Sequence, residues 1–181
     1  MFRFWHGPIV GLRLSHVWEG YAARIFLEFG KLSPSGHTRR DGSLGNPRGE
    51  FKLTNMHSYS GWELSLAGKS LATSEGRWPI RERVLKRLLI GRRLQSVAIE
   101  ARTRSTRLTF THGLVLSTEN LPHCYDHEPH WFHEPHWLLR LPNSGSNDWP
   151  HVVLAGTSST WASTIPTSSR WRTEDIRMVC P

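Results

Sequence analysis

The chain has 181 residues, of which 38% are hydrophobic and 21% are charged, so it is near the composition of globular proteins. This composition excludes a collagen-like, a coiled-coil and a wholly disordered protein. No window holds 18 apolar residues, so we expect neither a transmembrane helix nor a membrane partner. The length predicts one β-rich domain at residues 1–156. A poorly ordered tail is expected at 157–181, where Ser and Thr replace the apolar periodicity.

Basic residues exceed acidic ones, with 23 Lys and Arg against 15 Asp and Glu and a formal net charge of +8. Ten basic residues lie between positions 77 and 107, opposed only by Glu82 and Glu100. Such a stretch can bind an anionic partner, and the competing, more common interpretation is a solvated face of a helix and a hairpin. Cys124 and Cys180 form no CxxC motif or disulfide framework, and we see no signal-peptide pattern. We therefore expect a cytoplasmic protein.

In the first half of the chain, short alternating segments predict strands. Residues 9–14 are apolar-rich, residues 24–29 alternate and end at Gly30, and residues 51–53 resume a strand. Residues 62–66 alternate, turn at 68–69 and return over 70–73. Between these strands, residues 33–50 form a long polar loop with turn signals at Asp41-Gly42 and Asn46-Pro47.

Residues 79–90 predict the main helix. Pro79 suits the first helical turn, and Gly91 lies where a C-terminal cap belongs. Ile80, Val84 and Leu88 recur at i, i+4 and i+8, which indicates an apolar face.

The second half of the chain continues the strand pattern. Strands are predicted over residues 97–100, 107–111, 114–117, 137–141 and 151–154, with a turn at His112-Gly113. Strands joined by short turns pair antiparallel. The predicted fold class is therefore α+β, a mostly antiparallel β-sheet of short strands with one main helix at about 79–90.

The most unusual motif is the hexapeptide HEPHWF at 127–132, followed directly by HEPHWL at 133–138. Pro129 and Pro135 oppose a helix, and an extended polyproline II segment aligns residues spaced by three along one edge. The candidate metal ligands on this spacing are His127, His130, His133 and His136. They suit Zn²⁺ or Ni²⁺, so zinc is the one cofactor to consider. The competing interpretation is a tandem duplication in a surface loop.

The long polar loop is the best local candidate for recognition. Its glycines permit close backbone approach, and its three arginines can hold an anion. In the alternative, structural interpretation, Asp41 and Glu50 pair internally with those arginines. The candidate binding residues in this loop and in the Arg-rich stretch are Arg39, Arg40, Asp41, Arg48, Glu50, Arg92 and Arg93.

No motif indicates catalysis. The segment Gly68-Lys69-Ser70 lacks the upstream glycine of a phosphate-binding loop, because position 63 is Glu. No serine lies in a G-x-S-x-G elbow. Cys124 adjoins His123, but neighbouring residues rarely face each other productively, and a catalytic cysteine usually has its histidine far away in sequence. The sequence thus favours a protein that is not an enzyme.

Residues 25–32, 39–50 and 62–66, which include RRDGS and GNPRGE, resemble a group of uncharacterised bacterial proteins. That resemblance implies a bacterial origin and no activity. The segments LTFTHGLVLST (108–118) and HWLLRLP (136–142) are similar to small β-rich immunity-type proteins found near bacterial toxin genes.

The leading functional interpretation is a small cytoplasmic, immunity-like protein that binds an unidentified protein partner without catalytic activity. One alternative is a nucleic-acid-binding protein that uses the Arg-rich stretch 77–107, whose affinity would fall steeply with salt. The other alternative is a metal-binding protein or metal-dependent enzyme that uses the His-rich segment 123–137.

Overall fold

Two antiparallel sheets make up most of the fold. The computed structural model describes residues 2–55, 61–100, 105–118, 137–140, 151–153 and 177–179. The seven-stranded sheet has the order β12 (Arg177–Val179), β1 (Phe2–His6), β7 (Leu94–Glu100), β8 (Thr106–Phe110), β9 (Leu114–Thr118), β5 (Trp62–Leu66) and β6 (Lys69–Thr73). The five-stranded sheet has the order β11 (His151–Val153), β10 (Trp137–Arg140), β4 (Phe51–Asn55), β3 (Ile25–Phe29) and β2 (Leu14–Glu19).

The alternation predicted from the sequence places one face of β3 and one face of β9 in a shared core. In β3, Ile25, Leu27 and Phe29 are fully buried, and in β9, Leu114 and Leu116 are buried. One hydrophobic cluster joins the inner faces of both sheets. The predicted fold class, α+β with mostly antiparallel short strands and one main helix, is confirmed.

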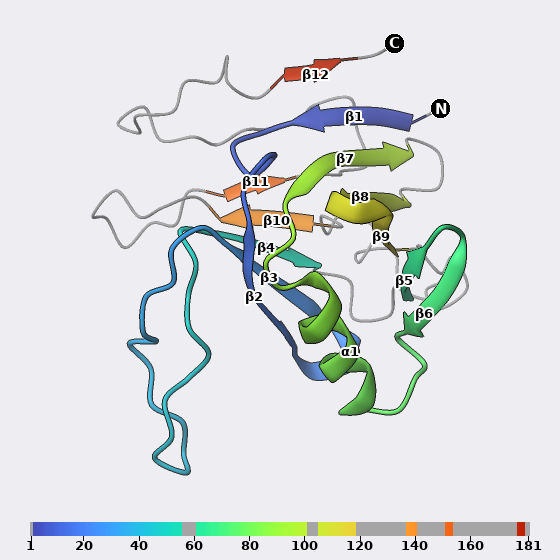
Figure 1. Ribbon diagram of the computed structural model, residues 1–181. Coiled ribbons are helices and arrows are strands. Elements are labelled where there is room, and N and C mark those ends of the chain that lie inside the picture. Colours follow the sequence, from blue (N-terminus) through green and yellow to red (C-terminus); the bar gives the residue numbers. More distant parts are fainter. Residues whose placement is uncertain are drawn as a thin grey trace, which may run out of the picture.

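Helix α1 (Ile80–Leu89) bridges the two sheets. It contacts β2 and β6, which are end strands of the five- and seven-stranded sheets (Figure 1). Leu85 and Leu89 are fully buried and insert into the core. Gly91 follows the helix with a φ of +84°, a conformation that glycine adopts without steric cost, as a C-terminal cap requires.

The two sheets are also joined through their backbones. The N–H of Leu14 donates to the carbonyl of Arg92 at 2.8 Å, and the N–H of Gly11 donates to the carbonyl of Leu94 at 2.7 Å. An isolated bridge pairs Arg13 with Arg93. The start of β2 therefore lies beside the start of β7.

One strand prediction in the N-terminal region is wrong, and two strands there were not predicted. Residues 8–11 form turns, so the strand expected at 9–14 begins only at Leu14. β2 escaped prediction because the register shifts between Leu14 and His16, which breaks the alternation of apolar side chains along the strand. β1 was not predicted either.

The C-terminal region contributes β12, which pairs antiparallel with β1. Its three residues belong to the segment expected to form a tail, and the rest of 157–181 lies outside the described residues. The division into a domain at 1–156 and a tail therefore stays a prediction. In the described part of the chain, no helix has the length and apolar character that crossing a membrane requires.

Candidate functional site

The long loop between β3 and β4 projects from the sheets as an arm, which we define as residues 30–50 (Figure 1). Isolated bridges pair Ser33 with Arg48 and Thr38 with Leu44, so the arm is a distorted hairpin. At its tip, the N–H of Gly42 donates to the carbonyl of Arg39 at 3.0 Å, and Gly42 has a φ of +80°. The turn predicted at Asp41-Gly42 is confirmed.

The acidic groups of the arm bind backbone and hydroxyl groups. Asp41 accepts hydrogen bonds from the N–H of Ser43 at 2.9 Å and from its hydroxyl at 2.6 Å, and these bonds lower the pKa of Asp41. Glu50 accepts the N–H of Lys31 at 3.0 Å. Within the described residues, neither carboxylate forms an ion pair with an arginine of the arm, so the internal pairing considered from the sequence is not observed.

The arm's arginines are consequently open to solvent. Arg39, Arg40 and Arg48 are all exposed. Arg39 donates to the amide oxygen of Asn46 at 3.1 Å, which positions its guanidinium along the arm.

The predicted binding residues do not form one cluster. Arg39, Arg40 and Asp41 lie at the tip of the arm, whereas Arg92 and Arg93 precede β7. The base of the arm is nearer to the second group, because Gly30 donates to the carbonyl of Arg13, which bridges Arg93. Arg92 and Arg93 themselves donate to the carbonyls of Leu88 and Gly11.

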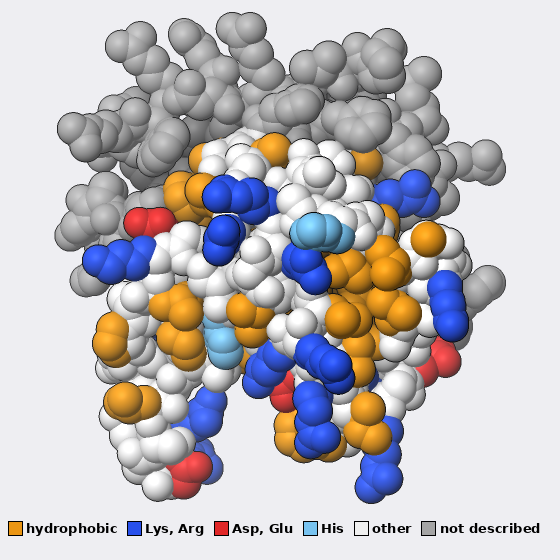
Figure 2. Space-filling model, in the orientation of Figure 1, with side chains coloured by type: hydrophobic (Ala, Val, Ile, Leu, Met, Phe, Trp, Pro, Cys, Tyr) orange, Lys and Arg blue, Asp and Glu red, His pale blue; other side chains and the backbone are white. Residues whose placement is uncertain are grey.

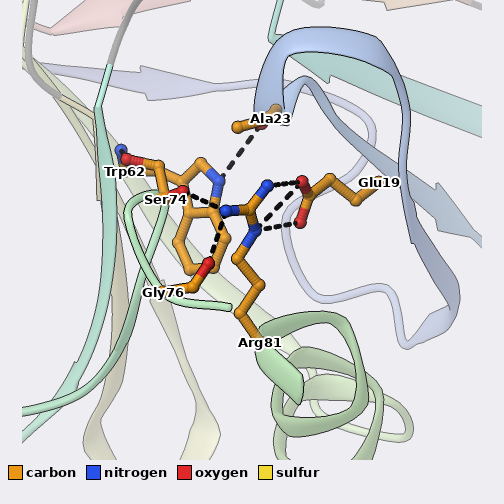
Figure 3. Close-up of polar contacts among 6 residues, drawn as sticks. All are labelled: Glu19, Ala23, Trp62, Ser74, Gly76 and Arg81. Atoms are coloured by element: carbon orange, nitrogen blue, oxygen red, sulfur yellow. Dashed lines mark hydrogen bonds and ion pairs between the residues drawn. The ribbon is translucent and has the colours of Figure 1, made fainter. Parts of the chain in front are cut away.

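The Arg-rich stretch is divided by the fold. Arg81 points inward, where it forms a bidentate pair with Glu19 and donates to the carbonyls of Ser74 and Gly76 (Figure 3). Glu19 raises the pKa of Arg81 through this hydrogen bonding. Lys86 pairs with Glu82 at 2.9 Å. Both cations are thus neutralised within the protein.

The unpaired arginines lie on the solvent face of α1 and just before it. Arg77, Arg83 and Arg87 are exposed, and none of their guanidinium groups forms a hydrogen bond or ion pair with another described residue. Figure 2 shows Lys and Arg side chains gathered over α1. Arg83 and Arg87 are spaced i, i+4, so they lie on one row of the helix.

The apolar row predicted from the sequence lies at the edge of the core, not in its centre. Ile80 is 53% exposed, and Val84 and Leu88 are only half-buried. The core takes Leu85 and Leu89, which lie about 100° further around the helix than Val84 and Leu88. Val84 and Leu88 pack against the edge of the core and Ile80 continues their row into solvent, so α1 carries a second, partly exposed apolar row.

The β5–β6 hairpin, whose strand β6 contacts α1, also has apolar side chains that are not fully buried. Leu66 is 40% exposed and Leu71 is half-buried against the core. Figure 2 shows apolar side chains gathered between α1 and the hairpin, with basic side chains around them. We call this region the α1–β6 surface and define it as Leu66, Leu71, Ile80, Val84 and Leu88, with Lys69, Arg83 and Arg87 as its exposed cationic rim.

Sequence reasoning missed this surface, although its signal was present. The sequence indicated an apolar face at Ile80, Val84 and Leu88, and that prediction did not include the buried pair Leu85 and Leu89. A helix with apolar residues at both sets of positions has a wider apolar arc than one core-facing side needs.

A pocket of about 200 Å³ lies beside β5 and β6 and is lined by Gly61, Trp62, Glu63, Thr73, Ser74, Glu75 and Ser117. Two hydroxyl groups of its lining form hydrogen bonds with the backbone: that of Ser74 accepts the N–H of Trp62, and that of Ser117 donates to the carbonyl of Glu63. Trp62, which lines the pocket, is also held by the segment before β3, because its indole N–H donates to the carbonyl of Ala23 at 3.1 Å (Figure 3). The lining of this pocket contains no histidine or cysteine to activate a nucleophile.

The four histidines predicted as zinc ligands, His127, His130, His133 and His136, lie outside the described residues. Among the residues that are described, no three His, Cys, Asp or Glu side chains gather closely enough to hold a metal ion. The chain matches no protein-family model, no curated protein and no solved structure.

Proposed function

We propose that the protein is a non-catalytic binding module that holds a protein partner at the α1–β6 surface. The observation that carries this proposal is the second apolar row of α1, where Ile80 is 53% exposed beside Val84 and Leu88. An apolar patch with a charged rim is typical of surfaces that bind other proteins. The protein would act in the cytoplasm, as the cysteine usage suggests, and the immunity-type resemblance fits a module that neutralises its partner by covering it.

The rim favours an acidic partner. Arg83 and Arg87 are exposed and unpaired among the described residues, whereas Arg81 and Lys86 already have carboxylate partners. Arginine is enriched in protein interfaces and forms bidentate bonds with carboxylates. The partner surface would therefore combine apolar side chains with carboxylates.

The alternative partner is a nucleic acid bound through the Arg-rich stretch, and two observations weigh against it. Among the described residues, the basic side chains of that stretch do not form a continuous row, because Arg81 is turned into the protein. An apolar row also occupies the middle of the α1–β6 surface, and phosphate contacts would leave it uncovered.

A peptide-display selection tests the proposed function. Random peptides are selected on the full chain, and the enriched sequences are then measured against the double variant Leu66→Glu/Ile80→Glu. Both residues are substantially exposed, so the variant should stay folded. We expect the affinity of the enriched peptides to fall at least about tenfold, which is the effect of losing about 1.4 kcal/mol of binding free energy.

The matched control is the double variant Leu32→Glu/Leu44→Glu, which makes the same change in net charge at two arm residues that are 38% and 66% exposed. It should leave binding unchanged. Peptides that bind the wild type and both variants equally, or a failure to enrich any peptide, would contradict the proposed function. Binding of labelled duplex DNA or RNA that weakens steeply between about 50 and 200 mM salt and depends on Arg83 and Arg87 would support the nucleic-acid alternative instead.

A further inference from the structure

Resting on this proposed function, we infer that the partner segment bound at the α1–β6 surface is an amphipathic helix with a row of acidic residues beside its apolar row. Two parallel rows of α1 carry this inference. Ile80, Val84 and Leu88 form the apolar row at i, i+4 and i+8, and Arg83 and Arg87 form the cationic row beside it.

Rows of this spacing are the ridges along which helices pack against each other. Ridges of i±4 residues in one helix fit the grooves between such ridges in another, which is the commonest helix–helix geometry in globular proteins. The apolar row spans about 12 Å at 1.5 Å per residue, which corresponds to about two turns of a partner helix. Strand β6 contacts α1, so Leu66 and Leu71 of the hairpin would receive the partner's next apolar residues.

The positive charges of Arg83 and Arg87 determine which residue type the partner helix would carry in its second row. A helix that packs on the apolar row would remove Arg83 and Arg87 from water, and a desolvated cation without a partner is costly. No described carboxylate pairs with either arginine, whereas Glu82 is engaged with Lys86 at 2.9 Å. The incoming helix would therefore supply Asp or Glu in a row next to its apolar residues.

The end strand β6 explains why a helix is favoured over an added strand. β6 has only five residues, begins with the exposed Lys69, and has a register shift opposite Leu64 and Ser65. Short length, an edge lysine and a bulge all discourage strand addition at a sheet edge. The side chains that face the α1–β6 surface are thus the better docking feature.

The test is a second selection, on helical peptides of about 18 residues, which are about 27 Å long. Each peptide has a fixed Leu row at i, i+4 and i+8, and the positions on either side of it are randomised among Glu, Gln and Lys. On the wild-type chain we expect Glu to be enriched on one side of the Leu row. The selected peptides should lose at least about tenfold in affinity for the variant Arg83→Glu/Arg87→Glu.

Two controls make the result specific. The variant Arg40→Glu/Arg48→Glu has the same change in net charge on exposed arm residues and should bind as the wild type does. Replacing Glu by Lys in a selected peptide should restore its affinity for Arg83→Glu/Arg87→Glu. Enrichment of Gln or Lys, or Glu-rich peptides that bind both double variants equally, would overturn the inference.

The outcomes also separate this inference from the proposed function. If random peptides require Leu66 and Ile80 but no acidic helix is selected, the protein-binding function stands and the helical acidic partner is wrong. If neither selection gives a peptide that depends on the α1–β6 surface, both proposals fail.

Discussion

Arg81 of α1 and Glu19 of β2, which are 62 positions apart, form a bidentate ion pair. The Nε atom of Arg81 lies 2.8 Å from Oε2 and 3.0 Å from Oε1 of Glu19, and the side chains are only 16% and 2% exposed. The same guanidinium donates to the carbonyls of Ser74 and Gly76, which follow β6. The Arg81 side chain thus links α1 to β2, an end strand of the five-stranded sheet, and to the residues that follow β6, an end strand of the seven-stranded sheet.

Replacing Arg81 by Met should strongly destabilise the fold. The substitution leaves the buried carboxylate of Glu19 and the carbonyl of Gly76 without their donor, and breaking a buried pair typically costs about 3 kcal/mol. The free energy of unfolding in urea measures this loss. The exposed Arg83→Met should change it by less than about 0.5 kcal/mol, and equal losses in both variants would contradict the assigned role of Arg81.

The two apolar faces of α1 should differ in their contribution to stability. Leu85 is fully buried, so Leu85→Ala should cost about 3 kcal/mol, the effect of a cavity in a packed core. Ile80 is 53% exposed, and Ile80→Ala should cost less than about 0.5 kcal/mol. Thermal or urea unfolding of the two variants compares them directly. A larger loss for Ile80→Ala would mean that the helix is rotated and that the α1–β6 surface is part of the core.

His16 should make stability depend on pH. Burial lowers its pKa from 6.5, the charge of Lys86 lowers it further, and Glu82 and Asn46 partly oppose these effects. The folded ring therefore binds its proton more weakly than the unfolded chain does, so the unfolded state gains protons first as the pH falls below about 6.5. Stability should be complete above this value and should decrease as the pH falls through it.

Urea unfolding of the wild type and of His16→Gln between about pH 5 and pH 8 checks this expectation. The difference in unfolding free energy between the two proteins should change with pH in that window. His37→Gln is a matched control, because His37 is exposed on the arm. Parallel curves for the wild type and His16→Gln would show that this histidine does not contribute.

The base of the arm should tolerate no side chain at Gly49. A Cβ atom there would lie 2.5 Å from the carbonyl oxygen and 2.8 Å from the nitrogen of Phe29, and both are backbone atoms that cannot turn away. The N–H of Gly49 also donates to the buried carboxylate of Glu28 at 3.0 Å. Gly49→Ala should therefore cost about 2 kcal/mol by overpacking, measured by urea unfolding. Gly36→Ala in the same arm meets no atom within 4 Å and should be close to neutral.

The two interpretations of the HEPHW repeat predict different calorimetric results. If its histidines ligate zinc, titration with Zn²⁺ should give heat that disappears when His127, His130, His133 and His136 are replaced by Asn. Identical titrations of the wild type and this variant would support the tandem duplication.

Much of the secondary structure could be predicted from local patterns. The alternation over 24–29 and 62–66 predicted β3 and β5. The helix-start signal of Pro79 and the helix-stop signal of Gly91 predicted the ends of α1 within one residue each. The strand β2 could not be predicted, because a register shift after Leu14 removes the period of two that identifies a half-buried strand.

The sequence by itself determined the fold class, because side-chain alternation and turn residues act over a few positions. Only the tertiary structure decided which arginines are available: Arg81 and Arg83 have the same chemistry, but Glu19 arrives beside one of them from 62 positions away. It also decided that α1 buries Leu85 and Leu89 and leaves Ile80 exposed. The physical reason is that burial and charge pairing depend on which distant strands pack against the helix, and local sequence does not contain that information.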